Sequence, residues 1–306
     1  MLLQYAHPWN CIDGRGITAG EVAKQNGHAD VYECLVEEGV RAELIFGILG
    51  RHTGGTDEGN ALSSGSCNSN GNALRSSDSV TGSKKPSNGQ YLSSPVKFSS
   101  DNTRILDSNN DAVMMSWETP LMIHHASYLV PISGLSILNV GYGLGIIDIE
   151  FQKSNPASHT IIEAHPDVYK KMIEDGWDKK ENVTILFGRW QDVLDKLDTS
   201  FDAIFFDTFG EFYEDLKEFH EHVPNLLSDN GTYSFFNGLG GHNIFFHDVY
   251  CRVAELDLKE MGIKVEYIPI DFTPPSDEEW AGVNRPYWCL GHYNMPICTM
   301  MGDDEW

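Results

Sequence analysis

Short apolar runs alternate with amphipathic stretches along most of the chain. From residue 91 to residue 306, apolar segments of strand length are separated by segments with helical periodicity. This alternation predicts an α/β fold, in which helices cover both faces of a sheet. The expected strands are 136–141, 159–164, 183–187, 201–207, 232–237, 264–270 and 287–293, and the expected helices include 166–175 and 244–261.

The last two expected strands are joined by a Pro-rich loop instead of a helix. A connection of this kind predicts a hairpin, which pairs antiparallel at an edge of the sheet. Pro166 is expected to open the helix 166–175, because proline suits the first helical turn.

The chain divides into three zones of different composition. Residues 1–50 have helical character with scattered glycines, and residues 51–90 consist largely of Gly, Ser and Asn. The second zone has almost no large apolar side chains, so it cannot bury enough surface to fold, and we expect a disordered linker. Residues 91–306 form the predicted α/β domain.

The first zone resembles one ankyrin repeat. Residues 13–19 supply a turn and the Thr start of a first helix, and the pair Gly27-His28 and a closing Gly39 follow. Gly20 stands where such repeats usually have Leu. One repeat cannot bury its own hydrophobic face, so it is expected to belong to a longer array or to dock on the α/β domain. An ordinary helical hairpin is the alternative.

The run Ser136–Ile146 is the most informative motif. It is an apolar strand that ends in a glycine-rich turn and then opens a helix. Glycines let a backbone turn tightly and approach a ligand closely. A dinucleotide site favours a small residue at the position of Ile146, so this spacing favours a nucleoside cofactor without phosphates, of which S-adenosylmethionine is the commonest.

Three further strand ends are expected at the same edge of the sheet. Glu163 ends the second strand, where an acid accepts hydrogen bonds from ribose hydroxyls. Gly188 follows the third strand, where a small residue lets an adenine ring approach the backbone. Asp207 closes the fourth strand at the carboxyl edge, where doubly wound sheets bind ligands, whereas Asp202 opens that strand and is expected to be structural.

The dipeptide Trp117-Glu118 lies upstream of the first of these strands. Glu118 is compatible with a helix start, since Thr119 and Pro120 follow it. A Trp next to a carboxylate also forms a clamp for a planar cation. The aromatic face attracts a guanidinium, and the carboxylate binds its fork in bidentate fashion.

Taken together, these motifs resemble guanidinoacetate N-methyltransferase and, still more, the type IV protein arginine methyltransferases of fungi and plants. The resemblance rests on residues 113–120, the glycine turn, and residues 161–163, 188–193 and 206–208, and it covers nearly the whole chain outside the linker. It implies a seven-stranded, doubly wound (Rossmann-like) S-adenosylmethionine-dependent methyltransferase fold with an N-terminal ankyrin-like helical segment. It also implies an enzyme that methylates protein arginine, on the internal delta nitrogen.

The resemblance further implies the site residues. Glu118 and Asp207 match the two acids that grip the guanidino group, and we expect Glu118 to act as the clamp and Asp207 to accept the proton. Trp117 and Asn237 complete the expected substrate site. The residues expected to hold S-adenosylmethionine are Tyr91, Met114, Met122, Gly141, Tyr142, Gly143, Leu144, Gly145, Ile146, Glu163, Ala164, His165, Gly188, Arg189 and Asp207.

The loop 237–242 departs from the guanidinoacetate enzyme. It is rich in glycine where that enzyme has substrate-contacting Thr and Ser. This replacement disfavours recognition of a small free carboxylate and opens room for a polypeptide.

Charge and cysteine content restrict the partners and the compartment. A net charge of −24 repels nucleic acid and favours a basic partner, although an acidic surface also serves solubility alone. We expect a basic protein substrate with an accessible arginine, and further protein contacts through the ankyrin-like segment. The six cysteines lie far apart and form no CxxC pair, which predicts a reducing compartment and no metal site.

No apolar run reaches the length of a membrane span, and the N-terminus has no secretory signal pattern. With the resemblance, these features predict a cytoplasmic and nuclear location without membrane contact.

Three other functions explain parts of the sequence. Methylation of a small guanidino compound is disfavoured by the ankyrin-like segment and the glycine-rich loop, and a catalytically inactive scaffold is disfavoured by the intact acids. A nicotinamide dehydrogenase is disfavoured by Ile146.

Glu211 and Glu214 follow the fourth strand, as two glutamates do in the commoner arginine methyltransferases. The sequence around them differs from that family, so we expect acids at a helix start.

The glycine turn generates a direct test of the cofactor. We expect S-adenosylhomocysteine to bind in isothermal titration calorimetry and NAD to give no binding heat, because the turn suits a nucleoside without phosphates. The opposite pair of results would contradict the expected cofactor.

Overall fold

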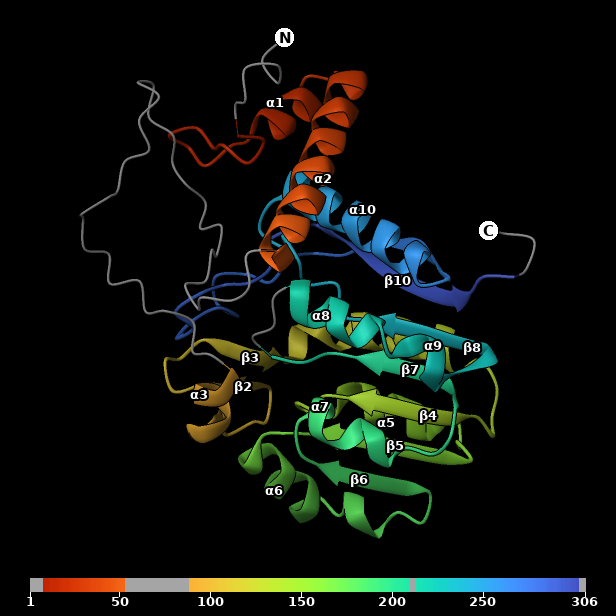
Figure 1. Cartoon of the computed structure of the whole chain (residues 1–306). Coiled ribbons are helices and arrows are strands. Elements are labelled where there is room, and N and C mark those ends of the chain that lie inside the picture. The colour runs from red at the N-terminus through yellow and green to blue at the C-terminus, as the bar shows by residue number, and fades with distance from the viewer. Residues whose placement is uncertain (1–7, 53–87, 210–212, 303–306) are drawn as a thin grey trace. The chain divides into compact units, whose positions relative to one another are not determined.

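The computed structural model describes residues 8–52, 88–209 and 213–302 (Figure 1). The expected linker 51–90 lies outside the described residues except at its two ends, and Glu211 also lies outside them. The chain forms two compact units. The smaller contains residues 1–82 and 239–256, and the larger contains residues 83–238 and 257–306.

The larger unit holds a seven-stranded sheet and a separate three-stranded sheet. Its elements in chain order are α3 (Asn88–Ser93), β1 (Lys97–Phe98), β2 (Arg104–Leu106), β3 (Ala112–Met115), the 3₁₀ turn η2 (Ser116–Glu118), α4 (Thr119–Leu129), β4 (Ser136–Val140), α5 (Ile146–Lys153), β5 (Ser158–Glu163), α6 (Pro166–Glu174), η3 (Trp177–Lys179), β6 (Val183–Phe187), α7 (Trp190–Val193), η4 (Leu194–Lys196), β7 (Phe201–Phe206), α8 (Tyr213–His220), α9 (Val223–Leu226), β8 (Leu227–Phe235), β9 (Ile263–Asp271) and β10 (His292–Met300). Helix α10 (Ile244–Glu260) begins in the smaller unit and ends in the larger.

The large sheet has the order β6-β5-β4-β7-β8-β10-β9. Strands β4 to β8 pair in parallel, whereas β10 is antiparallel to both β8 and β9. The strand order reverses at β4, which makes the sheet doubly wound, as the sequence predicts. The expected antiparallel hairpin at the edge is also confirmed, with β9 as the edge strand.

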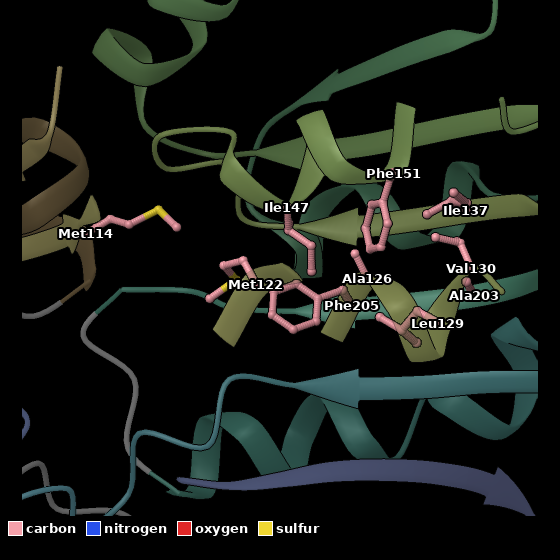
Figure 2. Close-up of a cluster of buried hydrophobic side chains, with 10 residues drawn as sticks. All are labelled: Met114, Met122, Ala126, Leu129, Val130, Ile137, Ile147, Phe151, Ala203 and Phe205. Carbon is pink, nitrogen blue, oxygen red and sulfur yellow. The ribbon is translucent and has the colours of Figure 1, made fainter. Parts of the chain in front are cut away.

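Two hydrophobic layers cover this sheet, because successive side chains of a strand point to opposite faces. On one face, Phe205 of β7 packs in a cluster with residues of β4, α4 and α5 (Figure 2). On the other face, Phe206 stacks on Phe219 of α8 at 4.2 Å between ring centroids, and Trp190 of α7 meets the same ring edge-on at 5.3 Å. Because the adjacent residues Phe205 and Phe206 of β7 are both apolar and point to opposite faces, helices pack on both faces of the sheet.

The small sheet leads directly into helix α4. Strands β1, β2 and β3 pair antiparallel, and the chain then passes through η2 into α4. Glu118 occupies the position directly before α4, and Pro120 lies in the first turn of the helix, where the missing N–H is tolerated. The helix start at Glu118 is therefore confirmed. The three-stranded sheet has no counterpart in the sequence prediction.

Two strands differ from the predicted boundaries. The segment 287–293 was expected as a strand, but β10 begins only at His292 and continues through Pro296 to Met300. Proline normally disfavours a strand interior, which makes this strand hard to recognise. Strand β8 begins at Leu227 instead of residue 232. Residues 228–231 resemble a turn in sequence but belong to the strand, and the pairing of β8 with β7 shifts its register between Phe201 and Ala203.

The smaller unit is built from two helices, α1 (Ala19–Gln25) and α2 (Ala29–His52), and the first part of α10. Thr18 caps α1, and its hydroxyl and Glu21 form a reciprocal capping box, as expected for a Thr helix start. Phe245 packs edge-on against Trp9 and Tyr32 at centroid distances of 5.8 and 5.9 Å. The ankyrin-like nature of this segment remains a prediction.

Among the described residues, none of the helices has the length and apolar content needed to cross a bilayer.

Gly20 provides a test of packing in the smaller unit. A Cβ at this position would lie 2.2 Å from the Phe245 ring, so Gly20→Ala overpacks the contact and should destabilise the protein by about 1–3 kcal/mol. Gly47→Ala is the control, because its Cβ meets nothing within 4 Å in helix α2 and should stabilise by about 0.5–1 kcal/mol. Urea unfolding followed by circular dichroism measures both, and equal effects would contradict this packing.

Candidate active site

The glycine turn lies between the ends of β4 and β7. Gly141, Gly143 and Gly145 all have positive φ angles, of 96°, 56° and 69°. A Cβ on Gly141 would lie 1.8 Å from the backbone oxygen of Asp207, because Val140 and Phe206 pair directly before them. Only glycine permits both this conformation and this approach, so the turn and Asp207 lie side by side.

Asn139 and Asp148 hold the glycine turn in place through hydrogen bonds. The Asn139 side-chain N–H donates to the backbone oxygen of Gly141 at 3.0 Å and to both oxygens of Asp148. Asp148 is fully buried at the start of α5 and pairs with His159 of β5 at 3.0 Å. These polar contacts hold the turn against the strand below it.

Glu163 lies at the end of β5, beside the turn. Its Oε2 accepts a hydrogen bond from the Tyr142 N–H at 3.0 Å, and its Oε1 accepts one from the His165 N–H at 2.6 Å. Burial raises the pKa of Glu163, and these two donors act in the opposite direction. Each carboxylate oxygen keeps lone-pair capacity for a further donor, such as a hydroxyl.

Tyr91 of α3 packs over the same strand end. Its ring lies 4.8 Å from the His165 ring and 4.5 Å from Phe209. The Nδ1 of His165 accepts from the Asp167 N–H, so its Nε2 carries the proton and donates to the Ser94 carbonyl at 2.9 Å. The structure therefore brings the expected residues Tyr91, Glu163 and His165 together.

Met114 contacts the glycine turn from β3. The Leu144 N–H donates to the Met114 sulfur at 3.1 Å, and a Cβ on Gly143 would lie 2.5 Å from that sulfur. Met122 belongs to the same hydrophobic cluster and is fully buried (Figure 2). Of the two methionines expected to contact the cofactor, Met114 lies at the turn and Met122 lies within the core.

The side chains of Tyr142, Leu144 and Ile146 pack into hydrophobic clusters. The Tyr142 side chain is 4% exposed and packs against Ile105, Ile161 and Trp177, and Leu144 and Ile146 pack against the core. The contact of Tyr142 with the cofactor remains a prediction.

The end of β6 carries Gly188 with a φ of 148°, followed by Arg189 before α7. The Gly188 N–H donates to the Glu163 carbonyl at 2.9 Å, which ties this strand end to β5. Gly188 and Ala164 are half-buried, and Arg189 is exposed. All three lie at the same edge as the glycine turn.

Glu118 is a deeply buried acid of the site. It is 3% exposed, and its Oε1 accepts hydrogen bonds from the Met115 N–H at 3.2 Å and from the Tyr287 hydroxyl. Burial, and then the charge of Asp207, raise its pKa above the ordinary value of 4.5, and the two donors only partly offset this. The two carboxylates expected to grip a guanidino group therefore lie close enough to interact.

Trp117 lies in a cluster of aromatic rings beside Glu118. It stacks on Phe272 at 5.9 Å with an interplanar angle of 7°, and it contacts Trp280, Tyr287 and Trp288 at 5.5 to 6.5 Å. The cation-binding role of Trp117 remains a prediction.

Tyr287 was not foreseen as a site residue. The sequence analysis placed Tyr287 at the start of the expected edge strand 287–293 and gave it no role in the site. The structure instead places the Tyr287 hydroxyl on Glu118, although the two residues lie far apart in the sequence. The aromatic density of the segment 280–288 was the only signal available.

Asn237 lies at the end of β8 and is 2% exposed. Its side-chain N–H donates to the Asn294 carbonyl, and its backbone N–H donates to the Tyr293 hydroxyl. The same hydroxyl contacts His125 of α4 at 2.9 Å, and burial lowers the pKa of His125 to about 3, which keeps it neutral. These hydrogen bonds of Asn237 fasten β8 to β10, and substrate contact by Asn237 remains a prediction.

The site fits a positively charged nucleoside better than a phosphate ester. Three carboxylates, Glu118, Glu163 and Asp207, converge on the edge that carries the glycine turn. Phosphates would be repelled there, whereas a sulfonium and a guanidinium would both be attracted. S-Adenosylmethionine matches this donor set.

Comparison with known proteins agrees with this chemistry. The family model described as guanidinoacetate N-methyltransferase matches residues 88–254. The chain is 41% identical to "Protein arginine N-methyltransferase 2" of Aspergillus oryzae, over 98% of this chain and 77% of that protein. It is 36% identical to the protein of the same name from Saccharomyces cerevisiae, over 98% of this chain and 76% of that protein.

Similarity to solved structures is weaker. The ribosomal protein L11 methylase of Lactobacillus delbrueckii subsp. bulgaricus aligns with a TM-score of 0.44 and 16% identity, over 64% of this chain and 84% of that chain. A likeness of this size has no bearing on function.

Gly141 provides a test of the site. Gly141→Ala places a Cβ against the Asp207 backbone, so it should abolish binding of S-adenosylhomocysteine in isothermal titration calorimetry. Gly134→Ala is the matched control. Gly134 also has positive φ, of 82°, but a Cβ there meets nothing within 4 Å, so the control should lose about 1–2 kcal/mol of stability and keep its affinity. Unchanged binding by Gly141→Ala would contradict the placement of the ligand at this turn.

Proposed function

Because the chain belongs to the family of fungal enzymes named protein arginine N-methyltransferase 2, we propose that the edge formed by β4, β5 and β7 methylates arginine side chains of proteins. The enzyme transfers a methyl group from S-adenosylmethionine, which is the donor in this family. The observation that carries the assignment of the site is the pair Glu118 and Asp207, two interacting carboxylates beside the glycine turn.

The glycine turn and Glu163 would hold the donor. Residues 141–145 offer close backbone approach, and Glu163 offers lone pairs to ribose hydroxyls. Tyr91, Met114 and His165 would line the same space. When bound there, S-adenosylmethionine supplies an electrophilic methyl group on sulfur.

Glu118 and Asp207 orient the guanidino group. A guanidinium is a poor nucleophile, because its lone pairs are delocalised and it carries a positive charge. Two carboxylates fix its plane and favour localisation of the charge on the nitrogens that they contact. The remaining nitrogen is then better able to attack, and such positioning supplies up to roughly 7–11 kcal/mol in favourable cases.

One proton must leave the nitrogen that becomes methylated. Asp207 accepts it, since Asp207 is half-buried and can pass the proton on to solvent, whereas Glu118 is almost completely buried. Both lone-pair positions of Glu118 Oε1 are taken by donors, which further suits Glu118 to a clamping role.

The internal delta nitrogen is the proposed methylation site. This choice is supported by the resemblance of residues 113–120 and of the strand ends to the type IV arginine methyltransferases. The net charge of −24 supports a basic protein segment as substrate, because opposite charge speeds encounter. We also propose that the α1–α2 segment serves ankyrin-like protein contacts, a role supported by the capped start of α1 at Thr18.

Glu118→Gln tests the clamp. The substitution keeps the shape of the side chain and removes its charge, so methyl transfer should fall at least 100-fold, on the scale expected for loss of a positioned ionic contact in a buried site. Transfer is measured as radiolabelled methyl incorporation into an arginine-rich protein, and tandem mass spectrometry locates the methyl group. Binding of S-adenosylhomocysteine should persist, because Glu118 does not hold the donor.

Glu181→Gln is the control for this experiment. Glu181 is exposed and lies before β6, so its loss of charge should leave transfer unchanged. Normal turnover by Glu118→Gln would refute the role of Glu118. Methyl groups found only on terminal nitrogens would refute the choice of the delta nitrogen and would leave the role of Glu118 intact.

A further inference from the structure

The loop between β9 and β10 is fastened to the small sheet that precedes Glu118. Arg104 of β2 donates to the Ala281 carbonyl at 2.8 Å, and the Asn284 N–H donates to the Asn110 carbonyl at 3.0 Å. Arg285 also pairs with Asp111 at 3.9 Å. These contacts fix the position of the loop relative to β3 and η2, from which Glu118 extends.

Tyr287 comes from this loop and ends on Glu118. Its ring contacts Trp117 at 5.5 Å and Trp280 at 5.1 Å, and its hydroxyl donates to Oε1 of Glu118. The Met115 N–H donates to the same oxygen. Both lone-pair positions of Oε1 are thereby used, and among the described residues none donates a hydrogen bond to Oε2.

We propose that Tyr287 is a positioning residue that occupies Oε1 of Glu118 and so restricts this carboxylate to a single hydrogen bond with the guanidino group, through Oε2. The inference rests on the proposed function and refines it. The sequence predicted a bidentate contact by the Glu118 carboxylate, with Asp207 as the second acid of the grip. With Oε1 occupied, the second contact to the guanidino group must come from Asp207.

The hydroxyl of Tyr287 is suited to remain a donor. Burial and the charges of Glu118 and Asp207 all raise the pKa of Tyr287 well above its ordinary value, so the hydroxyl keeps its proton throughout the neutral range. A permanent donor fixes the rotation of the Glu118 carboxylate, which a water molecule would not do.

The same hydrogen bond favours the ionised form of Glu118. The titratable groups that act on Glu118 are Asp207 from the end of β7 and Tyr287 from the loop. Asp207 opposes ionisation through its like charge, whereas the Tyr287 hydroxyl stabilises the carboxylate. Without the hydroxyl, Glu118 would be protonated up to a higher pH and would then no longer attract a cation.

Tyr287→Phe in the full chain is the decisive variant, because it removes one oxygen and keeps the ring. The acidic limb of the pH profile of kcat/KM should move to higher pH by on the order of one unit. At neutral pH, kcat/KM for an arginine peptide should fall about tenfold, and it should recover towards the wild-type value at alkaline pH. A purely structural role would lower kcat/KM equally at every pH.

Tyr213→Phe is the matched control. Tyr213 of α8 also donates its hydroxyl to a carboxylate, that of Asp257 in α10, which is not one of the proposed site acids. This variant should keep the wild-type pH profile. Binding of S-adenosylhomocysteine, measured by calorimetry, should be unchanged in both variants and shows that each is folded.

A fluorinated tyrosine at position 287 strengthens the hydrogen bond to Glu118 instead of removing it. This second variant tests the proposal even if Tyr287→Phe does not fold. Its more acidic hydroxyl is a stronger donor, so the acidic limb should move to lower pH. Wild-type pH profiles for both changes at position 287 would overturn the proposal while leaving the proposed function intact. A wild-type protein that transfers no methyl group to arginine would instead overturn the proposed function.

Discussion

The site depends on two negative charges that are held close together in a place largely removed from water. Glu118 is almost completely buried, and the charge of another acid, Asp207, raises its pKa further. Burial and like charge both oppose ionisation, so the empty site is electrostatically unfavourable. A planar cation relieves both penalties at once, which makes affinity for a guanidinium a direct consequence of how the two acids are placed.

The fold produces this placement through two unrelated parts of the chain. Asp207 is positioned by the parallel pairing of β4 and β7, because Gly141 lets the two strand ends approach without a side chain between them. Glu118 is positioned by the short sheet β1–β3, which leads through a 3₁₀ turn into α4. The network of His125, Ser234 and Tyr293 then ties α4 to β8 and β10 inside the core. Small shifts of α4 are thereby resisted by hydrogen bonds among fully buried groups.

Several features were recognisable in the sequence because they depend on local rules. The glycine turn and the helix start at Glu118-Thr119-Pro120 follow from backbone conformation, and the parallel strands follow from runs of apolar residues. The structural role of Asp202 is also confirmed, since its oxygens accept from the Ser136 N–H and the Ser228 hydroxyl. Strand β10 was misplaced, because Pro296 and the aromatic segment before it disguise where pairing begins.

The sequence by itself determined the doubly wound sheet and the residues of the turn, because periodicity and glycine spacing are properties of neighbouring residues. Only the tertiary structure decided that Tyr287 reaches Glu118, that Met122 lies in the core while Met114 lies on the turn, and that Tyr142 points into the interior. These outcomes depend on which distant segments pack together. A loop fastened by Arg104, Asn110 and Asp111 brings a hydroxyl to a carboxylate more than one hundred and sixty positions away, and no local pattern encodes such a contact.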